Sequence, residues 1–338
     1  MTATGDLNSL SELVFGAGVL ARGVAAIARP YALLAQPEPL EQADPSVREQ
    51  AAHVLLVGSL DEAELERLAE RTPEVAAVLG LGGGTAMDAA KFVALRRGVP
   101  LLLAPSAVSV DASVTNTVAV RAGGKVDYRG FVVAERVFID FTLIGQAPER
   151  MNRAGAGDLL SIHTAVWDWR HGAGKGGAEL VPEVARRAEE ILELIASLAG
   201  DIRAVSRRGI EAVVRCYAEI NEMANALGHA QLEEGSEHYF VYCLENVTGR
   251  SFIHGEAVTL GTVLMSVLQR NEPARVRAIA DAAGTRWRAA ELGLTPDDIA
   301  ATLRRLPGFV RAADLPWSVI DQAVIDEAAI SGLTEAAR

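Results

Sequence analysis

The chain has 338 residues, of which 44 are acidic and 32 are basic, so its formal net charge is −12. Nucleic acids and anionic membranes attract surplus positive charge, and the acidic balance therefore disfavours nonspecific binding to either. Half of the residues are apolar and 31 are glycine, a composition typical of a folded globular protein. This length predicts two domains, and a small molecule is the partner that fits best.

The N-terminal residues and the two cysteines bear on the compartment. The apolar stretch at 13–28 lacks the basic start of a secretion signal and is too short to span a bilayer. Cys216 and Cys243 fall inside expected helices and form no CxxC pair, so we expect two small buried thiols and no disulfide framework. These features predict a soluble, cytoplasmic protein.

Residues 1–148 alternate short aliphatic runs with helical periods. The runs predict four strands, at 31–36, 53–58, 75–80 and 100–105, and the helical spacing predicts helices at 61–72 and 85–98. Continuous apolar strands joined by helices indicate a parallel sheet covered on both faces. The stretch 118–140 predicts a hairpin about a Gly-Gly turn at the domain edge.

Residues 149–338 contain almost no strand pattern and predict successive helices. We expect turns at 171–177 and 248–250 and at four prolines, Pro273, Pro296, Pro307 and Pro316. The sequence thus predicts an α/β domain of the nucleotide-binding type over 1–148, followed by an all-α domain over 149–338.

A glycine-rich turn lies between an expected strand and an expected helix, in "VLGLGGGTAMDAAK" at 78–91. Gly82, Gly83 and Gly84 allow backbone N–H groups to approach an anion closely, and the helix that starts near Thr85 adds unpaired donors. A diphosphate fits such a turn, although a plain tight turn has the same sequence. The helix dipole alone would also account for Asp88 in the first turn.

Three residues offer the ligands of a divalent metal site. Asp158, after "GAG", supplies an oxygen, and His238 in "GSEH" and His254 in "HGEAV" supply nitrogens. This number and type of ligand is used by catalytic sites that leave one coordination position open. Asp158 could instead cap a helix, and His238 could lie on an ordinary helix face. The competing histidines are His53, His163, His171 and His229.

In this order, "GLGGGTAMDAAK", "PLLLAPSAVSVDASV", "APERMNRAGAGDLLS", "GSEH" and "HGEAV" resemble the iron-containing alcohol dehydrogenase superfamily. Within it, the sn-glycerol-1-phosphate and glycerol dehydrogenases are the most similar groups. The resemblance implies a dehydroquinate synthase-like fold, with a Rossmann-like N-terminal domain and a helical C-terminal domain. It also implies an NAD(P)-dependent enzyme that uses one divalent metal to interconvert a small polyol, with or without phosphate, and its ketone.

The resemblance also assigns residues. It implies that Gly82, Gly83, Gly84, Thr85 and Asp88 bind the cofactor, that Ser106 and Ser109 line its nicotinamide side, and that Asp111 lies near the substrate hydroxyls. Asp158, His238 and His254 match the metal ligands, and with Asp111 they form the expected catalytic set. Zinc is our first choice of metal, with iron or nickel as alternatives. NAD is favoured over NADP because no basic residue follows the 31–36 run closely.

Two departures from the family pattern concern the substrate. Glu233 and Glu234 precede "GSEH" where an Arg-Pro segment is expected, and Tyr242 stands four residues after His238 where a second histidine is expected. Carboxylates beside the site would repel a substrate phosphate. Two other functions stay open: a sugar-phosphate cyclase of the 3-dehydroquinate synthase type, which uses NAD transiently, and a non-catalytic ligand-binding homologue. We also expect a homo-oligomer.

Overall fold

The computed structural model describes residues 11–122 and 125–338, and the chain divides into two compact units, Met1–Asn152 and Arg153–Arg338. The division lies close to the boundary after residue 148 that the sequence suggests. The expected Gly-Gly turn at 123–124 lies outside the described residues.

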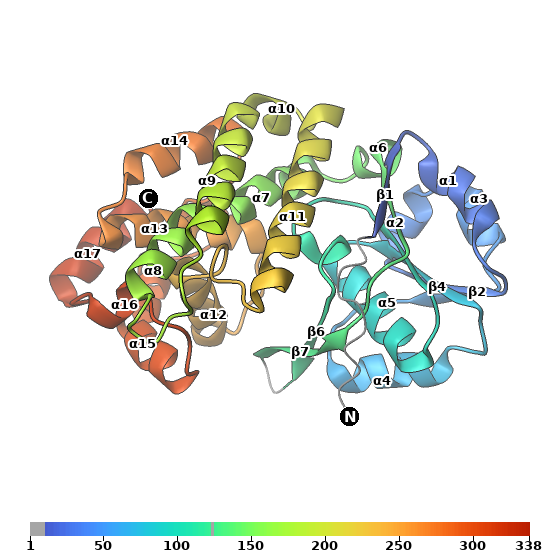
Figure 1. Cartoon of the computed structure of the whole chain (residues 1–338), viewed down its shortest axis with the longest axis horizontal. Helices are drawn as coiled ribbons and strands as arrows, with labels where there is room; N and C mark the ends of the chain where they lie inside the picture. Colours follow the sequence, from blue (N-terminus) through green and yellow to red (C-terminus); the bar gives the residue numbers. More distant parts are fainter. Residues whose placement is uncertain (1–10, 123–124) are drawn as a thin grey trace. The chain divides into compact units, whose positions relative to one another are not determined.

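The first unit is built on a parallel sheet of six strands in the order β1-β8-β5-β4-β2-β3 (Figure 1). The strands are β1 (Glu12–Gly16), β2 (Tyr31–Ala35), β3 (His53–Leu56), β4 (Ala77–Gly82), β5 (Leu101–Pro105) and β8 (Arg136–Asp140). Every residue of β2, β4 and β5 is buried, because helices cover both faces of a parallel sheet.

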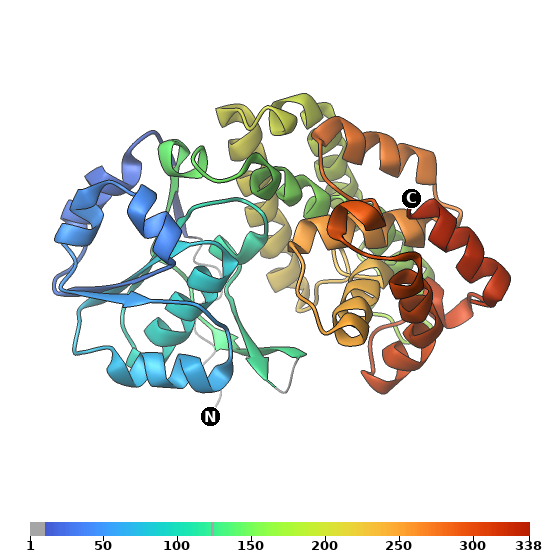
Figure 2. The same ribbon diagram turned by 180° about the vertical axis from the view of Figure 1, so that it is seen from behind.

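The helices of the first unit lie on two sides of the sheet. They are α1 (Val19–Gly23), α2 (Pro37–Gln42), α3 (Pro45–Glu49), α4 (Glu62–Arg71), α5 (Gly84–Arg97) and α6 (Phe141–Ile144), with 3-10 turns η1 (Val24–Ala26) and η2 (Asp111–Ser113). Both views show α1 and α3 on one side of the sheet and α4 and α5 on the other (Figures 1 and 2). The order of the strands reverses between β2 and β4, and ligands of open α/β sheets bind outside the carboxyl ends of strands at such a point.

Several details of the first unit differ from the sequence expectations. The 75–80 run shifts to Ala77–Gly82, because pairing with β2 and β5 continues through the glycines. The hairpin consists of β6 (Thr117–Ala122) and β7 (Lys125–Phe131), while the rest of the 118–140 stretch contributes β8 to the main sheet. Strand β1 comes from the N-terminal apolar stretch, for which no strand was predicted.

The second unit is helical, as the sequence predicts. Helix α7 (Glu149–Leu159) leads into it, followed by α8 (Ile162–Gly172), α9 (Pro182–Ser197), α10 (Ala199–Arg203), α11 (Arg207–Leu227), α12 (Ser236–Thr248), α13 (His254–Gln269), α14 (Pro273–Ala283), η3 (Ala289–Leu292), α15 (Pro296–Ala312), α16 (Val319–Gln322) and α17 (Glu327–Ala336). Pro273 and Pro296 begin helices, where the missing N–H costs nothing. Pro307 lies inside α15 and not in the turn that we expected.

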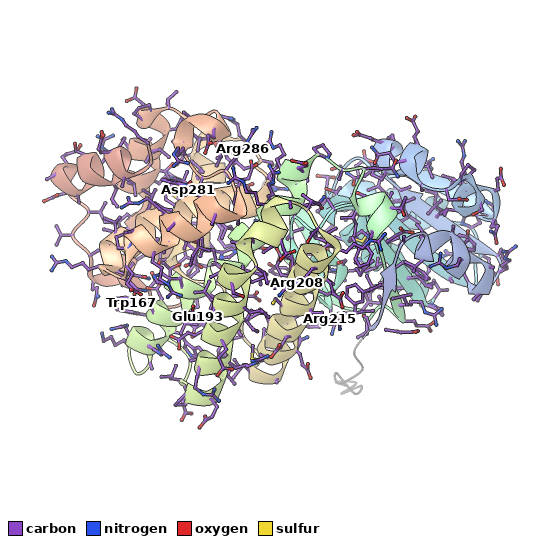
Figure 3. All side chains as sticks on the ribbon, turned by 90° about the horizontal axis from the view of Figure 1, so that it is seen from above. Trp167, Glu193, Arg208, Arg215, Asp281 and Arg286 are labelled. Atoms are coloured by element: carbon purple, nitrogen blue, oxygen red, sulfur yellow. The ribbon has the colours of Figure 1, made fainter. Side chains whose placement is uncertain are left out.

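Helix α13 belongs to the main apolar cluster of the second unit, in which α12 packs against both α13 and α15. Thirteen of its sixteen residues are buried, so it is surrounded by protein on almost every side. The outward faces of α9, α11 and α14 carry charged side chains, among them Glu193, Arg208 and Arg215 (Figure 3). Among the described residues, no helix is both long enough and apolar enough to cross a membrane.

Candidate metal centre and cofactor loop

Three side chains of the second unit converge on one point. Asp158 Oδ1 lies 3.3 Å from His254 Nε2 and 3.7 Å from His238 Nε2, and the two Nε2 atoms are 3.3 Å apart. The donor atoms of the three residues all lie within 4.8 Å of one another. The structure thus brings together the metal ligands that the sequence suggests.

Each ligand occupies the end of a helix. His238 is in the first turn of α12 and His254 is the first residue of α13. Asp158 lies in the last turn of α7, not at a helix start, so the capping role considered from the sequence is wrong. A carboxylate is disfavoured at a helix C-terminus by the dipole, and its presence there points to a cationic partner.

Three glycines allow the ligand helices to approach one another. A Cβ atom at Gly255 would overlap the carbonyl oxygen of Ala154 on α7, and one at Gly157 would overlap Thr259 on α13. A Cβ at Gly261 would lie 2.5 Å from the carbonyl oxygen of Glu237 on α12. The Cβ at Gly157 would also overlap the Gly255 carbonyl oxygen, so all three glycines face backbone atoms and no larger residue fits without separating the helices.

Buried groups behind the cluster hold the ligands in place. Glu237 is fully buried, and its Oε1 lies 3.0 Å from His238 Nδ1 and accepts from Gly235 N at 2.6 Å. Its Oε2 accepts from the Thr164 hydroxyl at 2.7 Å. A carboxylate at Nδ1 fixes the tautomer that leaves Nε2 free for a metal. On the other side, the Tyr217 hydroxyl lies 3.1 Å from Asp158 Oδ2.

The charges of the cluster stabilise one another. Burial alone would raise the pKa of Asp158, but the charges and hydrogen bonds of His254 and His238 hold this pKa well below its usual range. Burial works to lower the pKa of His238, whereas the hydrogen bonds to Asp158 and Glu237 raise it well above its ordinary value. The negative charges of Asp158 and Glu237, which raise the pKa of His238, also favour a bound cation at this point.

The donor set fits a divalent metal ion. One carboxylate and two imidazoles suit zinc, iron(II) and nickel(II). Asp158 and His238 are buried, whereas the His254 side chain is 34% exposed, so the site stays accessible on the His254 side. Three protein ligands and one accessible side are the features of a catalytic rather than a structural site.

The other histidines take no part in this cluster. His163 Nε2 lies 2.8 Å from the Asn271 carbonyl oxygen, and His229 packs against the edge of Trp169. His171 is in the last turn of α8, not in a loop, and stacks on Trp167 with ring centroids 3.7 Å apart. His53 is exposed on strand β3.

In the first unit, the glycine turn follows β4 at the carboxyl edge of the sheet. Gly82 ends the strand with φ +147, and a Cβ there would lie 2.6 Å from the Gln36 side-chain oxygen and 2.8 Å from Ala86. Gly83 precedes helix α5, which begins at Gly84, and the Gly83 N–H donates to Gln36 Oε1 at 2.7 Å. The turn therefore lies at the point between β2 and β4 where the strand order reverses, with Thr85 in the first turn of α5.

The other predicted residues of the first unit lie near this edge. Ser106 and Ser109 are buried after β5, and the Ser106 N–H donates to the Gly82 carbonyl at 2.8 Å. Asp111 opens the 3-10 turn η2, and a Cβ at Gly84 would lie 3.1 Å from the neighbouring Val110. These contacts place the serine segment beside the glycine turn.

Asp88 faces the protein interior. Its Oδ1 accepts from Lys91 Nζ at 3.1 Å and from Ala119 N at 3.3 Å, and Lys91 also donates to the Thr117 carbonyl at 3.0 Å. Burial raises the pKa of Asp88, while the charge and hydrogen bond of Lys91 act against this rise. The pair joins α5 to β6, a structural role; its part in cofactor binding stays a prediction.

Sequence reasoning did not assign three residues that the structure places at these sites. Glu237 lies inside the "GSEH" motif, beside a predicted ligand, and could have been proposed on that ground. Tyr217 and Gln36 are 59 and 47 residues from their partners Asp158 and Gly83, and no motif marks either of them.

The chain belongs to the iron-containing alcohol dehydrogenase family, whose model matches residues 39–148. Its curated relatives include the glycerol-1-phosphate dehydrogenase (NAD(P)+) of Aeropyrum pernix, 31% identical over 248 residues, which cover 73% of this chain and 69% of that protein. The enzyme of the same name from Thermoplasma volcanium is 26% identical over 255 residues, with 75% and 72% covered.

Solved structures agree on the fold. Glycerol dehydrogenase from Schizosaccharomyces pombe superimposes with a TM-score of 0.71 at 20% identity, over 97% of this chain and 90% of that one. Maleylacetate reductase from Agrobacterium tumefaciens gives a TM-score of 0.72 at 16% identity, over 100% and 98%. At these identities the likeness establishes the architecture, an α/β domain followed by a helical domain.

Proposed function

We propose that this protein is a metal-dependent, NAD(P)-linked oxidoreductase that interconverts a small polyol and its ketone. The convergence of Asp158, His238 and His254 donor atoms within 4.8 Å is the observation that carries the proposal. It has support from the relatives, which are named as NAD(P)+ dehydrogenases of a polyol phosphate.

The reaction removes a hydride from an alcohol carbon and a proton from its hydroxyl. NAD(P)+ accepts the hydride, the proton passes to solvent, and the reverse direction uses NAD(P)H and a proton to reduce the ketone. A bound divalent ion supplies Lewis acidity at the substrate oxygen, where negative charge develops.

The chain's own residues bind and orient. Asp158, His238 and His254 hold the ion, while Glu237 and Tyr217 fix the orientation of His238 and Asp158. The exposed side of His254 leaves room for the substrate oxygen. We propose that Asp111 contacts the substrate hydroxyls, as the family resemblance implies.

The cofactor would bind at the carboxyl edge of the sheet in the first unit. Gly82, Gly83, Gly84 and Thr85 would hold the diphosphate at the start of α5, where free N–H groups and the helix dipole favour an anion. Ser106 and Ser109 would line the nicotinamide side. The segment after β2 carries the exposed, acidic Glu38, which disfavours a 2′-phosphate, so NAD is proposed over NADP.

The test is a measurement of net cofactor turnover by the purified protein loaded with zinc, iron or nickel in separate samples. We expect reduced nicotinamide to accumulate with NAD+ and a small polyol such as glycerol. A cyclase would regenerate its cofactor and show no net change, and a non-catalytic homologue would bind metal and NAD without turnover. Zinc as the native metal, the homo-oligomer and the cytoplasmic location stay predictions.

A further inference from the structure

A partly buried glutamate is held beside the metal-binding histidine. Glu234 immediately precedes the "GSEH" motif, and its Oε1 accepts a hydrogen bond of 2.8 Å from the Tyr242 hydroxyl. Tyr242 lies one helical turn beyond His238, with ring centroids 6.2 Å apart. The hydrogen bond therefore fixes a carboxylate on the same side of α12 as the metal ligand.

The charges around His238 are mostly negative. Asp158 Oδ1 and Glu237 Oε1 lie 3.7 and 3.0 Å from its two ring nitrogens, and the Glu234 carboxylate is held by Tyr242 one helical turn away. When a divalent ion is bound, both imidazoles are neutral ligands, so two positive charges face three carboxylates. A phosphate dianion arriving here would meet a net negative charge.

Two basic side chains on the ligand-bearing segments, Arg153 and Arg250, are directed to other partners. Arg153 on α7 donates to the Arg203 carbonyl at 2.8 Å. Arg250, just before α13, donates to the carbonyl groups of Gly293 and Leu292 at 2.9 and 3.2 Å. These guanidinium groups cap other helices, and so a phosphate would have to compete with backbone carbonyls for them.

We infer that the substrate of this site is an uncharged polyol or hydroxy ketone, and that Glu234, held by Tyr242, disfavours a phosphate ester. The inference rests on the proposed function and separates this chain from relatives that are named for glycerol-1-phosphate. Glu234 is thus a specificity-determining residue, with no part in holding the metal.

The experiment compares a neutral and a phosphorylated form of the same substrate. The zinc-loaded protein with NAD+ is titrated with glycerol and with glycerol-1-phosphate in a calorimeter, and NADH-linked rates are measured with dihydroxyacetone and its phosphate. We expect the phosphate ester to bind about tenfold more weakly and to have about tenfold lower kcat/KM. A wild-type preference for the phosphate ester in both measurements would overturn the inference.

The variant Glu234→Gln keeps an oxygen that accepts from Tyr242 and removes the charge. We expect it to raise the ratio of phosphate-ester to neutral binding at least about fivefold, whereas Glu335→Gln, on exposed α17, has the same charge change and should leave the ratio as it is. If Glu234→Gln leaves the ratio of phosphate-ester to neutral binding unchanged, the inference is also wrong. If no substrate is turned over, the proposed function fails, and the calorimetric ratio still decides the inference.

Discussion

The Glu237 carboxylate lies 3.0 Å from Nδ1 of His238, the imidazole whose other nitrogen faces Asp158 and His254. Glu237 is fully buried and is the neighbour of His238 in the sequence, so the same helical turn that supplies the ligand also supplies the group that orients it. This relationship joins the fold of α12 to the chemistry of the metal centre.

Replacing Glu237 by glutamine should weaken metal binding. In one orientation of the glutamine, its amide nitrogen would face the donors His238 Nδ1 and Gly235 N. In the other orientation it would face the Thr164 hydroxyl, which is also a donor. We expect the affinity for zinc to fall about 10- to 100-fold, measured by competition with a chelator. Thr164→Val removes one donor but keeps the carboxylate on His238, and it should have a smaller effect. Equal zinc affinity in wild type and Glu237→Gln would refute the orienting role.

A methyl group at Gly255 should disrupt the metal centre through the backbone. It would overlap the Ala154 carbonyl and push α13 away from α7, which carries Asp158. We expect Gly255→Ala to lower the free energy of unfolding by about 1–3 kcal/mol and to weaken zinc binding. The matched control is Gly308→Ala in α15, where a Cβ meets nothing within 4 Å. That control should stabilise the protein by up to about 1 kcal/mol, and a similar gain in Gly255→Ala would show that the close approach is unimportant.

Lys91→Met should destabilise the first unit. The Lys91 ammonium group is fully buried and pairs with Asp88, so its removal leaves a buried carboxylate that keeps the hydrogen bond from Ala119 N but has lost its cation. We expect a loss of about 3–5 kcal/mol in the free energy of unfolding, measured with urea. The double variant Lys91→Met with Asp88→Leu removes the orphaned charge and should recover much of the loss. A loss in the double variant as large as in the single one would show that the pair is not the cause.

His163 should make the protein less stable as the pH falls. Its ring donates to the Asn271 carbonyl, and burial lowers its pKa below the ordinary value. The unfolded chain therefore binds a proton at His163 more readily than the folded protein does. The stability that neutral His163 contributes is present above the pKa of His163 in the unfolded chain, and it is lost as the pH falls through and below that pKa. His163→Gln can donate the same hydrogen bond without titrating. Urea unfolding between about pH 8 and pH 5 should show a shallower decrease in the variant, and identical slopes would contradict the assignment.

The sequence predicted those features of the fold and the site that produce a periodic pattern or a motif. The aliphatic runs of β2, β4 and β5 predicted a parallel sheet, since strands buried on both faces are apolar throughout. Residue type and the resemblance to the family together suggested Asp158, His238 and His254 as ligands, and the structure brings these three residues together. Strands β1 and β8 were missed, because β1 begins a longer apolar stretch that continues into α1 and β8 directly follows the hairpin.

Side-chain partners across long sequence separations could not be predicted. The Tyr217 contact with Asp158 depends on how α11 packs against α7, and no local pattern encodes that packing. Asp158 was expected at a helix start because "GAG" usually breaks a helix, yet α7 continues through these glycines. It does so because Gly157 and Gly255 permit the tight contact with α13, a tertiary effect that overrides local propensity.

The metal content of purified His254→Ala, measured beside that of the wild type, tests the central claim most directly. His254 lies in the open part of the cluster, 3.3 Å from both Asp158 Oδ1 and His238 Nε2. We predict one tightly bound divalent ion in the wild type, and in the variant the loss of that ion together with polyol-dependent reduction of NAD(P)+. A folded His254→Ala protein that keeps both the ion and the activity would contradict the assignment of the metal centre.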